Sequence, residues 1–306
     1  MKHFFRSLSF QLGLIFCAVI LLSGHQSVAY TIAPPQVSEI KGDGVIKILA
    51  IGNSFSEDAL EYFLYDLAKA GGHKIIIGNL YIGGAELALH WKNASGNKDA
   101  YSYRKIGKDG EKVVRSKMSI ASALADERWD YISFQQVSSK SGLYQTYTEP
   151  LPALVNYVKE KVQNPDTRYI LHQTWAYAQT STHKGFANYG NSQKKMYSAI
   201  VKTTNKINKA YHFDMLIPSG TAIQNARTSF VGDHMNRDGY HLNLILGRYT
   251  ASCTWYEKIF NESVIGNTFH PEKLSNYETE MAQNAAHTAV LNPFKVTVLK
   301  QFKSNR

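Results

Sequence analysis

Cysteine is scarce in this chain of 306 residues, which contains only Cys17 and Cys253. Cys17 lies in an N-terminal segment with the features of a removable export signal, so Cys253 is expected to stand alone and no intramolecular disulfide can form. The sequence also has no Cys-x-x-Cys pair, which argues against a zinc site built from cysteine. Neither disulfide cross-links nor a cysteine-based metal site is therefore expected.

Acidic residues are fewer than basic ones. The chain has 34 lysines and arginines and 24 aspartates and glutamates, and without residues 1–29 the difference is 32 − 24 = +8. Because the lysines are scattered singly or in pairs, the surplus indicates a solvated basic surface rather than a nucleic-acid-binding arm. We therefore expect no nucleic-acid partner, whereas an acidic polysaccharide stays open as a partner.

The first 29 residues resemble an export signal in composition. Lys2 and Arg6 precede an apolar run at residues 8–22, and small residues lead to a predicted cleavage site after Ala29. The run is short for a membrane span, and the residues before Cys17 lack the small side chains of a lipid-attachment site. We expect a secreted or periplasmic protein with no stable membrane anchor after signal cleavage.

The remaining chain is expected to form an arm and one domain. Residues 30–44 contain Pro34-Pro35 and predict an extended N-terminal arm. Residues 45–306 have a suitable length for a single α/β domain with insertions. Apolar segments rich in β-branched residues alternate in this domain with helical patterns, at residues 45–51, 74–81, 129–134, 169–171 and 213–217. This alternation predicts a doubly wound, flavodoxin-like parallel sheet of about five strands flanked by helices.

A polar stretch interrupts the strand and helix alternation after residue 93. Asp109-Gly110 separates two runs of alternating residues, which is a hairpin signal. We therefore expect a hairpin inserted near the edge of the sheet that carries the site.

The first predicted strand leads directly into a helical pattern, and Ser54 lies at the junction. Gly52-Asn53 precedes this serine, and the helix is expected to begin near Glu57. A serine at the carboxyl end of a buried parallel strand lies beside a helix N-terminus, whose free N–H groups can stabilise an oxyanion. Ser54 is the candidate nucleophile, and helix capping is the alternative role.

Glycines and side-chain amides follow the next two predicted strands. Gly83 and Gly84 follow the second, and a glycine lets a backbone N–H approach a reacting group closely. Gln135 and Gln136 follow the third, where a buried carboxamide needs a hydrogen-bonding partner such as an oxyanion. Turn formation explains the glycines equally well, and hydrogen bonding to loops explains the glutamines equally well.

Aromatic residues follow the fourth predicted strand. Trp175 and Tyr177 lie shortly after His172 at the same expected edge of the sheet. We predict that the two aromatic rings bind sugars, whereas the histidine is expected to be structural.

Asp238 and His241 are three positions apart, a spacing at which both side chains can face one way on a turn. Nucleophilic serine chemistry requires an imidazole that accepts the hydroxyl proton and a carboxylate that orients the imidazole. Metal binding by His234, Asp238 and His241 is a weaker alternative, because no further ligand cluster is present and Ser54 would be left unexplained.

These motifs together resemble the SGNH (GDSL-like) hydrolase superfamily, and within it a secreted bacterial branch associated with polysaccharide degradation. The resemblance covers residues 45 to about 260. It implies the SGNH hydrolase fold, with Ser54 as nucleophile and with Asp238 and His241 as acid and base. It further implies an oxyanion hole formed by the N–H groups of Ser54 and of Gly84, which is preferred over Gly83.

The sequence departs from the pattern of this superfamily in two ways. Asn53 stands where the commoner signature has aspartate. The Gly-x-Asn-Asp of the third motif is missing, and Gln136 is expected to supply its oxyanion donor. Gln135 is the alternative donor and is also predicted to bind substrate.

We expect a serine esterase that works through an acyl-enzyme and needs no metal or cofactor. Export and the family branch favour a carbohydrate esterase that removes acetyl groups from a polysaccharide or oligosaccharide. One alternative is a methylesterase acting on uronic-acid glycans, with Arg227 or Arg248 binding the substrate carboxylate. Another is a catalytically inactive glycan-binding protein with the same fold. The sequence has no long apolar lid or amphipathic membrane helix, which disfavours lipid esters.

Overall fold

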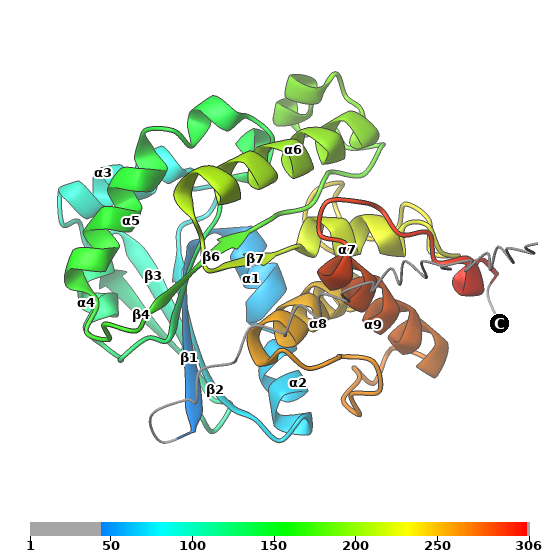
Figure 1. Cartoon of the computed structure of the whole chain (residues 1–306), viewed down its shortest axis with the longest axis horizontal. Helices are drawn as coiled ribbons and strands as arrows, with labels where there is room; N and C mark the ends of the chain where they lie inside the picture. The colour runs from blue at the N-terminus through cyan, green and yellow to red at the C-terminus, as the bar shows by residue number, and fades with distance from the viewer. Residues whose placement is uncertain (1–43, 305–306) are drawn as a thin grey trace, which may run out of the picture. The chain divides into compact units, whose positions relative to one another are not determined.

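The computed structural model describes residues 44–304 (Figure 1). The predicted signal peptide at 1–29 and nearly all of the predicted arm at 30–44 lie outside the described residues. Within the described part, the strands are β1 (Val45–Gly52), β2 (Lys74–Tyr81), β3 (Tyr101–Ile106), β4 (Lys112–Met118), β5 (Tyr131–Phe134), β6 (Arg168–His172) and β7 (Met215–Ile217).

Helices connect most of these strands. The α-helices of the described part are α1 (Ser54–Leu60), α2 (Leu64–Ala70), α3 (Leu87–Ser95), α4 (Ile120–Leu124), α5 (Pro150–Lys161), α6 (Gln193–Tyr211), α7 (Ser219–Ala226), α8 (Leu246–Phe260) and α9 (Asn276–Leu291). Short 3₁₀ turns are η1 (Ser138–Lys140), η2 (Tyr144–Thr146), η3 (Lys184–Tyr189) and η4 (Lys300–Phe302).

The strands form one sheet in the order β4-β3-β2-β1-β5-β6-β7. From β2 to β7 the neighbours are parallel, in the order β2-β1-β5-β6-β7 that defines a flavodoxin-like sheet. The sheet has seven strands rather than about five, because β3 pairs antiparallel with β2 and β4 pairs antiparallel with β3. The chain around Asp109-Gly110 thus extends the main sheet.

Both faces of the sheet are covered, which explains why β1 is apolar at every position except Lys47. Ile48 and Ala50 pack in one core with residues of α1, α2, α7, α8 and α9. Leu49 and Ile51 point to the opposite face and pack with residues of α3, α4 and α5. Figure 1 shows these two groups of helices on either side of the strands. No helix within residues 44–304 is both long enough and apolar enough to cross a bilayer.

Two buried histidines make the stability of the fold depend on pH. Burial disfavours the charged imidazole and lowers the pKa of His90 from 6.5 to about 4 and that of His172 to about 3. The unfolded chain therefore binds protons below pH 6.5 that the folded chain does not bind. We expect the free energy of unfolding to fall with decreasing pH, by about 1.4 kcal/mol per pH unit for each histidine.

Urea unfolding measured at several pH values tests this expectation. His90→Asn removes one of the two groups. The slope of the free energy of unfolding against pH, between pH 6.5 and about 4, should therefore decrease by about 1.4 kcal/mol per pH unit, the value for one proton. An unchanged slope in this variant would show that His90 is not buried in its neutral form.

Candidate active site

The candidate site lies beside β1, at the point where the strand order reverses: the chain passes from β1 to β2 on one side, and β5 lies on the other side. β1 is hydrogen-bonded to β2 on one side and to β5 on the other. Ligand sites of open α/β sheets form at such a switch point, beyond the carboxyl ends of the strands. Ser54 follows β1 and Gln135 follows β5, so both lie at this edge.

Asn53 caps α1 and shapes the turn that carries Ser54. Its side-chain oxygen accepts a hydrogen bond from the Phe55 N–H at 2.9 Å, and its own N–H donates to Ser56 Oγ at 3.1 Å. This reciprocal capping starts the helix at Ser54 rather than near Glu57. Glycine is required just before the cap, because a Cβ on Gly52 would lie 2.3 Å from Ser56 Oγ.

Ser54, His241 and Asp238 form a continuous hydrogen-bonded chain. His241 Nε2 lies 2.8 Å from Ser54 Oγ, although the two residues are 187 positions apart. His241 Nδ1 lies 2.6 Å from Asp238 Oδ2. The histidine side chain is 18% exposed and the aspartate side chain 40% exposed, so solvent reaches the chain. This is the order of contacts in a catalytic triad.

Asp238 is held in its ionised form. Burial by itself raises the pKa of Asp238, but hydrogen bonds from the His241 side chain and from the N–H groups of His241 and Tyr240 outweigh burial, so the pKa lies below its usual value. The carboxylate can therefore fix the tautomer of the imidazole and stabilise an imidazolium. Gly239, between these residues, has a φ of +89°, which favours glycine in this turn.

A buried carboxylate attaches this turn to the helix that carries Ser54. Asp58 on α1 has a side chain that is 1% exposed and accepts hydrogen bonds from Arg237 Nη1 at 3.1 Å and Arg248 Nε at 2.8 Å. Asp58 also accepts the N–H of Leu242 at 2.9 Å, immediately after the histidine of the triad. Because Asp58 lies four residues after Ser54, this cluster fixes the two halves of the triad to each other.

Trp175 joins the same two segments from inside the core. Its ring stacks on Phe55 with centroids 4.3 Å apart, and its Nε1–H donates to the Tyr240 carbonyl at 2.9 Å. The indole is fully buried, with 0% exposure. The predicted role as a sugar platform is therefore not available to Trp175, which instead supports the residues that follow Ser54 and precede His241.

Tyr177 is likewise buried at 0% exposure and presents no face to a sugar. Its hydroxyl contacts Ser138 Oγ at 2.8 Å and His183 Nδ1 at 3.4 Å. The aromatic residues after β6 were predicted as ligand platforms from their position at the strand end. They are instead core residues, because the 3₁₀ turn η3 and the turn around Tyr240 pack over them.

His183 is a residue of the site region that the sequence did not indicate. Its ring lies 4.8 Å from Tyr240, whose ring lies 4.2 Å from His241. Nδ1 accepts the N–H of Gly185 at 3.0 Å, so in the neutral ring the proton is on Nε2. Burial, together with the nearby His241, lowers the pKa of His183, which favours the neutral ring. Within residues 44–304 the Nε2–H has no hydrogen-bond partner.

Two backbone N–H groups are available to bind an oxyanion. Residues 82–85 form a turn in which the Ala85 N–H donates to the Ile82 carbonyl at 3.1 Å and Gly84 has a φ of +66°. A positive φ at the third position of a turn favours glycine. In the described part of the chain the N–H groups of Gly84 and Ser54 have no internal acceptor, as an oxyanion hole requires.

The predicted carboxamide donor to the oxyanion is not present at Gln136. Its Oε1 accepts the N–H of Leu87 at 3.0 Å and of Val137 at 2.8 Å. Its Nε2 donates to the carbonyl of Thr146 at 3.0 Å and to the Thr146 hydroxyl at 3.1 Å. The side chain is 1% exposed and both of its amide atoms are occupied in joining loops, so it has no free donor for an oxyanion.

Gln135 is also occupied, and at 2% exposure it is shielded from substrate. Its Nε2 donates to Asn53 Oδ1 at 2.9 Å, and its Oε1 lies 2.8 Å from His172 Nδ1. The substrate-binding role predicted for Gln135 therefore does not agree with its position beneath the Ser54 turn.

The arginines considered as carboxylate clamps are both internal. Arg227 donates to the Ala176 carbonyl at 3.0 Å and to Asn236 Oδ1 at 2.6 Å, and its Nε lies 3.1 Å from Asp233. Burial, only partly offset by Asp233, lowers the pKa of Arg227 to about 10. Arg248 is paired with Asp58. Neither guanidinium is free to bind a substrate carboxylate.

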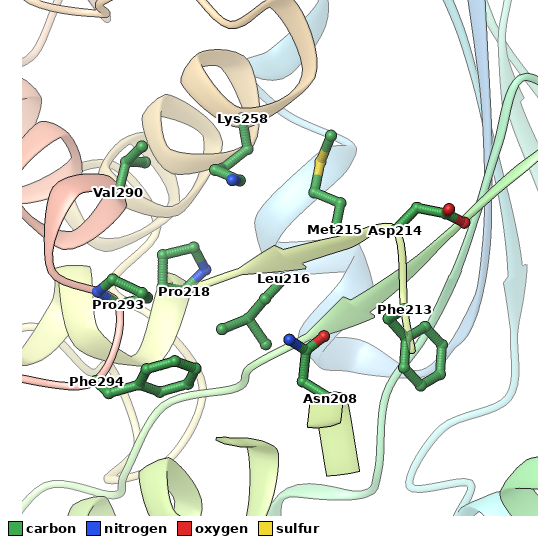
Figure 2. Close-up of a pocket in the computed structure, with 10 residues that line it drawn as sticks. All are labelled: Asn208, Phe213, Asp214, Met215, Leu216, Pro218, Lys258, Val290, Pro293 and Phe294. Carbon is green, nitrogen blue, oxygen red and sulfur yellow. The ribbon is translucent and has the colours of Figure 1, made fainter. Parts of the chain in front are cut away.

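Two further features bear on ligands. Within residues 44–304 there is no group of three or more histidine, cysteine, aspartate or glutamate side chains that could hold a metal ion. A hollow of about 220 Å³ lies beside β7. Figure 2 shows the residues that line it, among them Asn208, Lys258 and Phe294. None of the predicted site residues lines this hollow.

Comparison with known proteins identifies relatives of this chain. A solved DUF4886 family protein from Bacteroides uniformis is 52% identical, with a TM-score of 0.83 over 85% of this chain and 100% of that chain. A putative SGNH hydrolase from Slackia heliotrinireducens is 18% identical, with a TM-score of 0.48 over 70% of this chain and 99% of that chain. TesA is 14% identical, with a TM-score of 0.40 over 70% of this chain and 96% of that chain.

The last two likenesses are too low to carry over an activity or a site. No curated protein matches the sequence. The family model described as "Domain of unknown function (DUF4886)" matches residues 47–289, and the solved relative is from the same family. The chain therefore belongs to the DUF4886 family.

Proposed function

We propose that this protein is a serine hydrolase that cleaves carboxylic esters through an acyl-enzyme. The single observation that carries the proposal is the chain from Ser54 Oγ to His241 Nε2 at 2.8 Å and from His241 Nδ1 to Asp238 Oδ2 at 2.6 Å. A nucleophile within hydrogen-bond reach of a base, which is itself oriented by a third group, is the arrangement that activates serine.

The proposed reaction has two steps. Ser54 Oγ attacks the ester carbonyl carbon while His241 Nε2 takes the hydroxyl proton, and Asp238 stabilises the imidazolium that forms. The N–H groups of Ser54 and Gly84 stabilise the developing oxyanion. The imidazolium then protonates the departing alcohol oxygen, and the neutral ring activates a water molecule that releases the acid from Ser54.

For the substrate we propose an acetylated carbohydrate. An alcohol with several hydroxyl groups offers acceptors to the Nε2–H of His183, which lies beside the triad and has no internal partner in the described part of the chain. The export signal predicted at residues 1–29 suits an extracellular or periplasmic glycan substrate. The methylesterase alternative loses its support, because Arg227 and Arg248 are held in internal contacts.

The role of His183 leads to a selectivity prediction. His183→Phe keeps a ring against Tyr240 and removes the Nε2–H. We expect kcat/KM for acetylated sugars to fall by about 2- to 10-fold, the value of one hydrogen bond, with a smaller loss for 4-nitrophenyl acetate. Equal losses for both esters would contradict a contact with the sugar.

A substrate screen tests the proposed function itself. Mature protein is incubated with acetylated and with methyl-esterified glycans, and released acetate is scored against released methanol. We expect acetate release that Ser54→Ala abolishes. Methanol release alone would replace the acetylesterase proposal with the methylesterase. Glycan binding without release of either product would identify a catalytically inactive binding protein.

A further inference from the structure

Beneath the triad, a row of buried polar side chains that the proposed chemistry does not use joins five separate segments of the chain. Ser219 Oγ lies 3.0 Å from His172 Nε2, and His172 Nδ1 lies 2.8 Å from Gln135 Oε1. Gln135 Nε2 donates to Asn53 Oδ1 at 2.9 Å, and Asn53 Nδ2 donates to the Ala85 carbonyl at 2.9 Å. Each of these residues is at most 2% exposed.

The contacts of Asn53, at one end of this row, determine the direction of the hydrogen bonds from Asn53 to His172. The Ala85 carbonyl and the Phe55 N–H require Asn53 to present its amide nitrogen to the first and its oxygen to the second. The same oxygen faces Gln135, which must therefore donate through Nε2. The remaining oxygen of Gln135 then requires a proton on His172 Nδ1. A single arrangement satisfies all of the groups.

The row ends at the loop that carries the second oxyanion donor. Ala85 directly follows Gly84, and Asn53 directly precedes Ser54. The hydrogen bond from Asn53 to Ala85 therefore joins the two backbone segments whose N–H groups are proposed to bind the oxyanion. A misplacement of about 1 Å in such a group can lower the rate by about 10²-fold.

We propose that Asn53, Gln135 and His172 are positioning residues that hold the Gly84 loop at a fixed distance from the Ser54 turn. This inference rests on the proposed ester hydrolysis. It accounts for the departure from the commoner aspartate before the nucleophile, since an ionised aspartate cannot donate to the Ala85 carbonyl. It also gives a function to Gln135, which is neither an oxyanion donor nor a substrate ligand.

One test does not depend on turnover. ¹⁵N NMR of the histidine side chains in the wild-type protein reports which ring nitrogen of His172 is protonated. We expect the proton on Nδ1 from pH 5 to pH 9, because burial keeps the pKa of His172 far below this range, at about 3. Protonation on Nε2, or a charged ring, would overturn the proposed row even if the enzyme has another activity.

The second test uses kinetics. Asn53→Asp and Gln135→Glu each remove one amide donor of the row at nearly constant shape, and kcat and KM for 4-nitrophenyl acetate are measured as a function of pH. For Asn53→Asp we expect a fall in kcat of about 10²-fold at alkaline pH with little change in KM. The ratio of variant to wild-type kcat should rise as the pH is lowered, because a protonated carboxyl can donate to Ala85 again.

The matched control is Gln173→Glu. Gln173 is 0% exposed and adjacent to His172, but its amide contacts Thr204 and Thr221 rather than the row. For this variant the kcat ratio should not depend on pH, even if urea unfolding shows lower stability. A pH-independent kcat ratio in Asn53→Asp and in Gln135→Glu would overturn the inference. If one of these two variants does not fold, the result for the other decides.

Absence of Ser54-dependent turnover in the wild type would reject the proposed function. The NMR result would then decide the inference.

Discussion

Ser54→Ala and His241→Ala are each expected to lower kcat for 4-nitrophenyl acetate by at least about 10⁴-fold. The first removes the nucleophile, and the second removes the base that lies 2.8 Å from it. Because the two side chains act in the same step, the double variant should be no less active than either single variant. Steady-state kinetics of the three variants measures this effect.

The control for this prediction separates chemistry from folding. Ser54 is the first residue of α1 and is only partly buried, so Ser54→Ala should keep the urea midpoint of the wild type. Turnover that survives both single substitutions would reject the triad. If the fold-reduction in kcat of the double variant equals the product of the fold-reductions of the two single variants, the two side chains act independently.

Asp58→Ala is expected to lower the free energy of unfolding by about 3–5 kcal/mol, the usual result of removing one partner from a buried ion pair. The carboxylate is 1% exposed and pairs with Arg248, which is itself only 8% exposed. Its loss leaves that guanidinium buried without a counter-charge and releases the Leu242 N–H beside His241. We therefore expect kcat to fall as well, even where the variant is fully folded.

Urea unfolding with Asp58→Asn as the comparison tests the cause. Asparagine keeps the shape and one acceptor oxygen but not the charge, so its destabilisation should be smaller than that of alanine. A loss below about 1 kcal/mol in Asp58→Ala would show that the carboxylate behaves like an exposed surface pair, and its proposed role in joining α1 to the turn around His241 would not hold.

The sequence predicted the parts of the site that depend on local signals. Ser54 follows an apolar strand and precedes a helix, and Asp238 and His241 have a spacing that suits a turn. These features depend on residue type and short separations, so they can be recognised without a structure. The alternation of strands and helices predicted the parallel sheet for the same reason.

The roles of the remaining residues could not be predicted, because they depend on partners far away in the chain. Trp175 follows a strand, as a ligand platform would, but its contacts are with Phe55 and Tyr240. The guanidinium of Arg227 could bind a substrate carboxylate, but it already donates to the Ala176 carbonyl and to the Asn236 side chain. Sequence gives the side-chain type at a strand end and not the direction in which it is buried.

His183, in contrast, is a residue near the candidate site that no sequence pattern indicated. It precedes the short 3₁₀ turn η3 in an irregular segment, where no periodic pattern distinguishes it from other polar residues. Only the folding of this segment over the turn around Tyr240 places His183 against the ring of Tyr240, which itself packs on His241. The strand count failed for a related reason, since a hairpin signal does not say which sheet the hairpin joins.

Labelling with a fluorophosphonate is the most direct measurement of the central claim, because such a reagent forms a stable bond only with an activated serine. Intact mass and peptide mapping should show one adduct per chain, on Ser54, absent in Ser54→Ala and formed much more slowly in His241→Ala. An unlabelled wild-type protein, or an adduct on another residue that persists in Ser54→Ala, would contradict the assignment of Ser54 as an activated nucleophile.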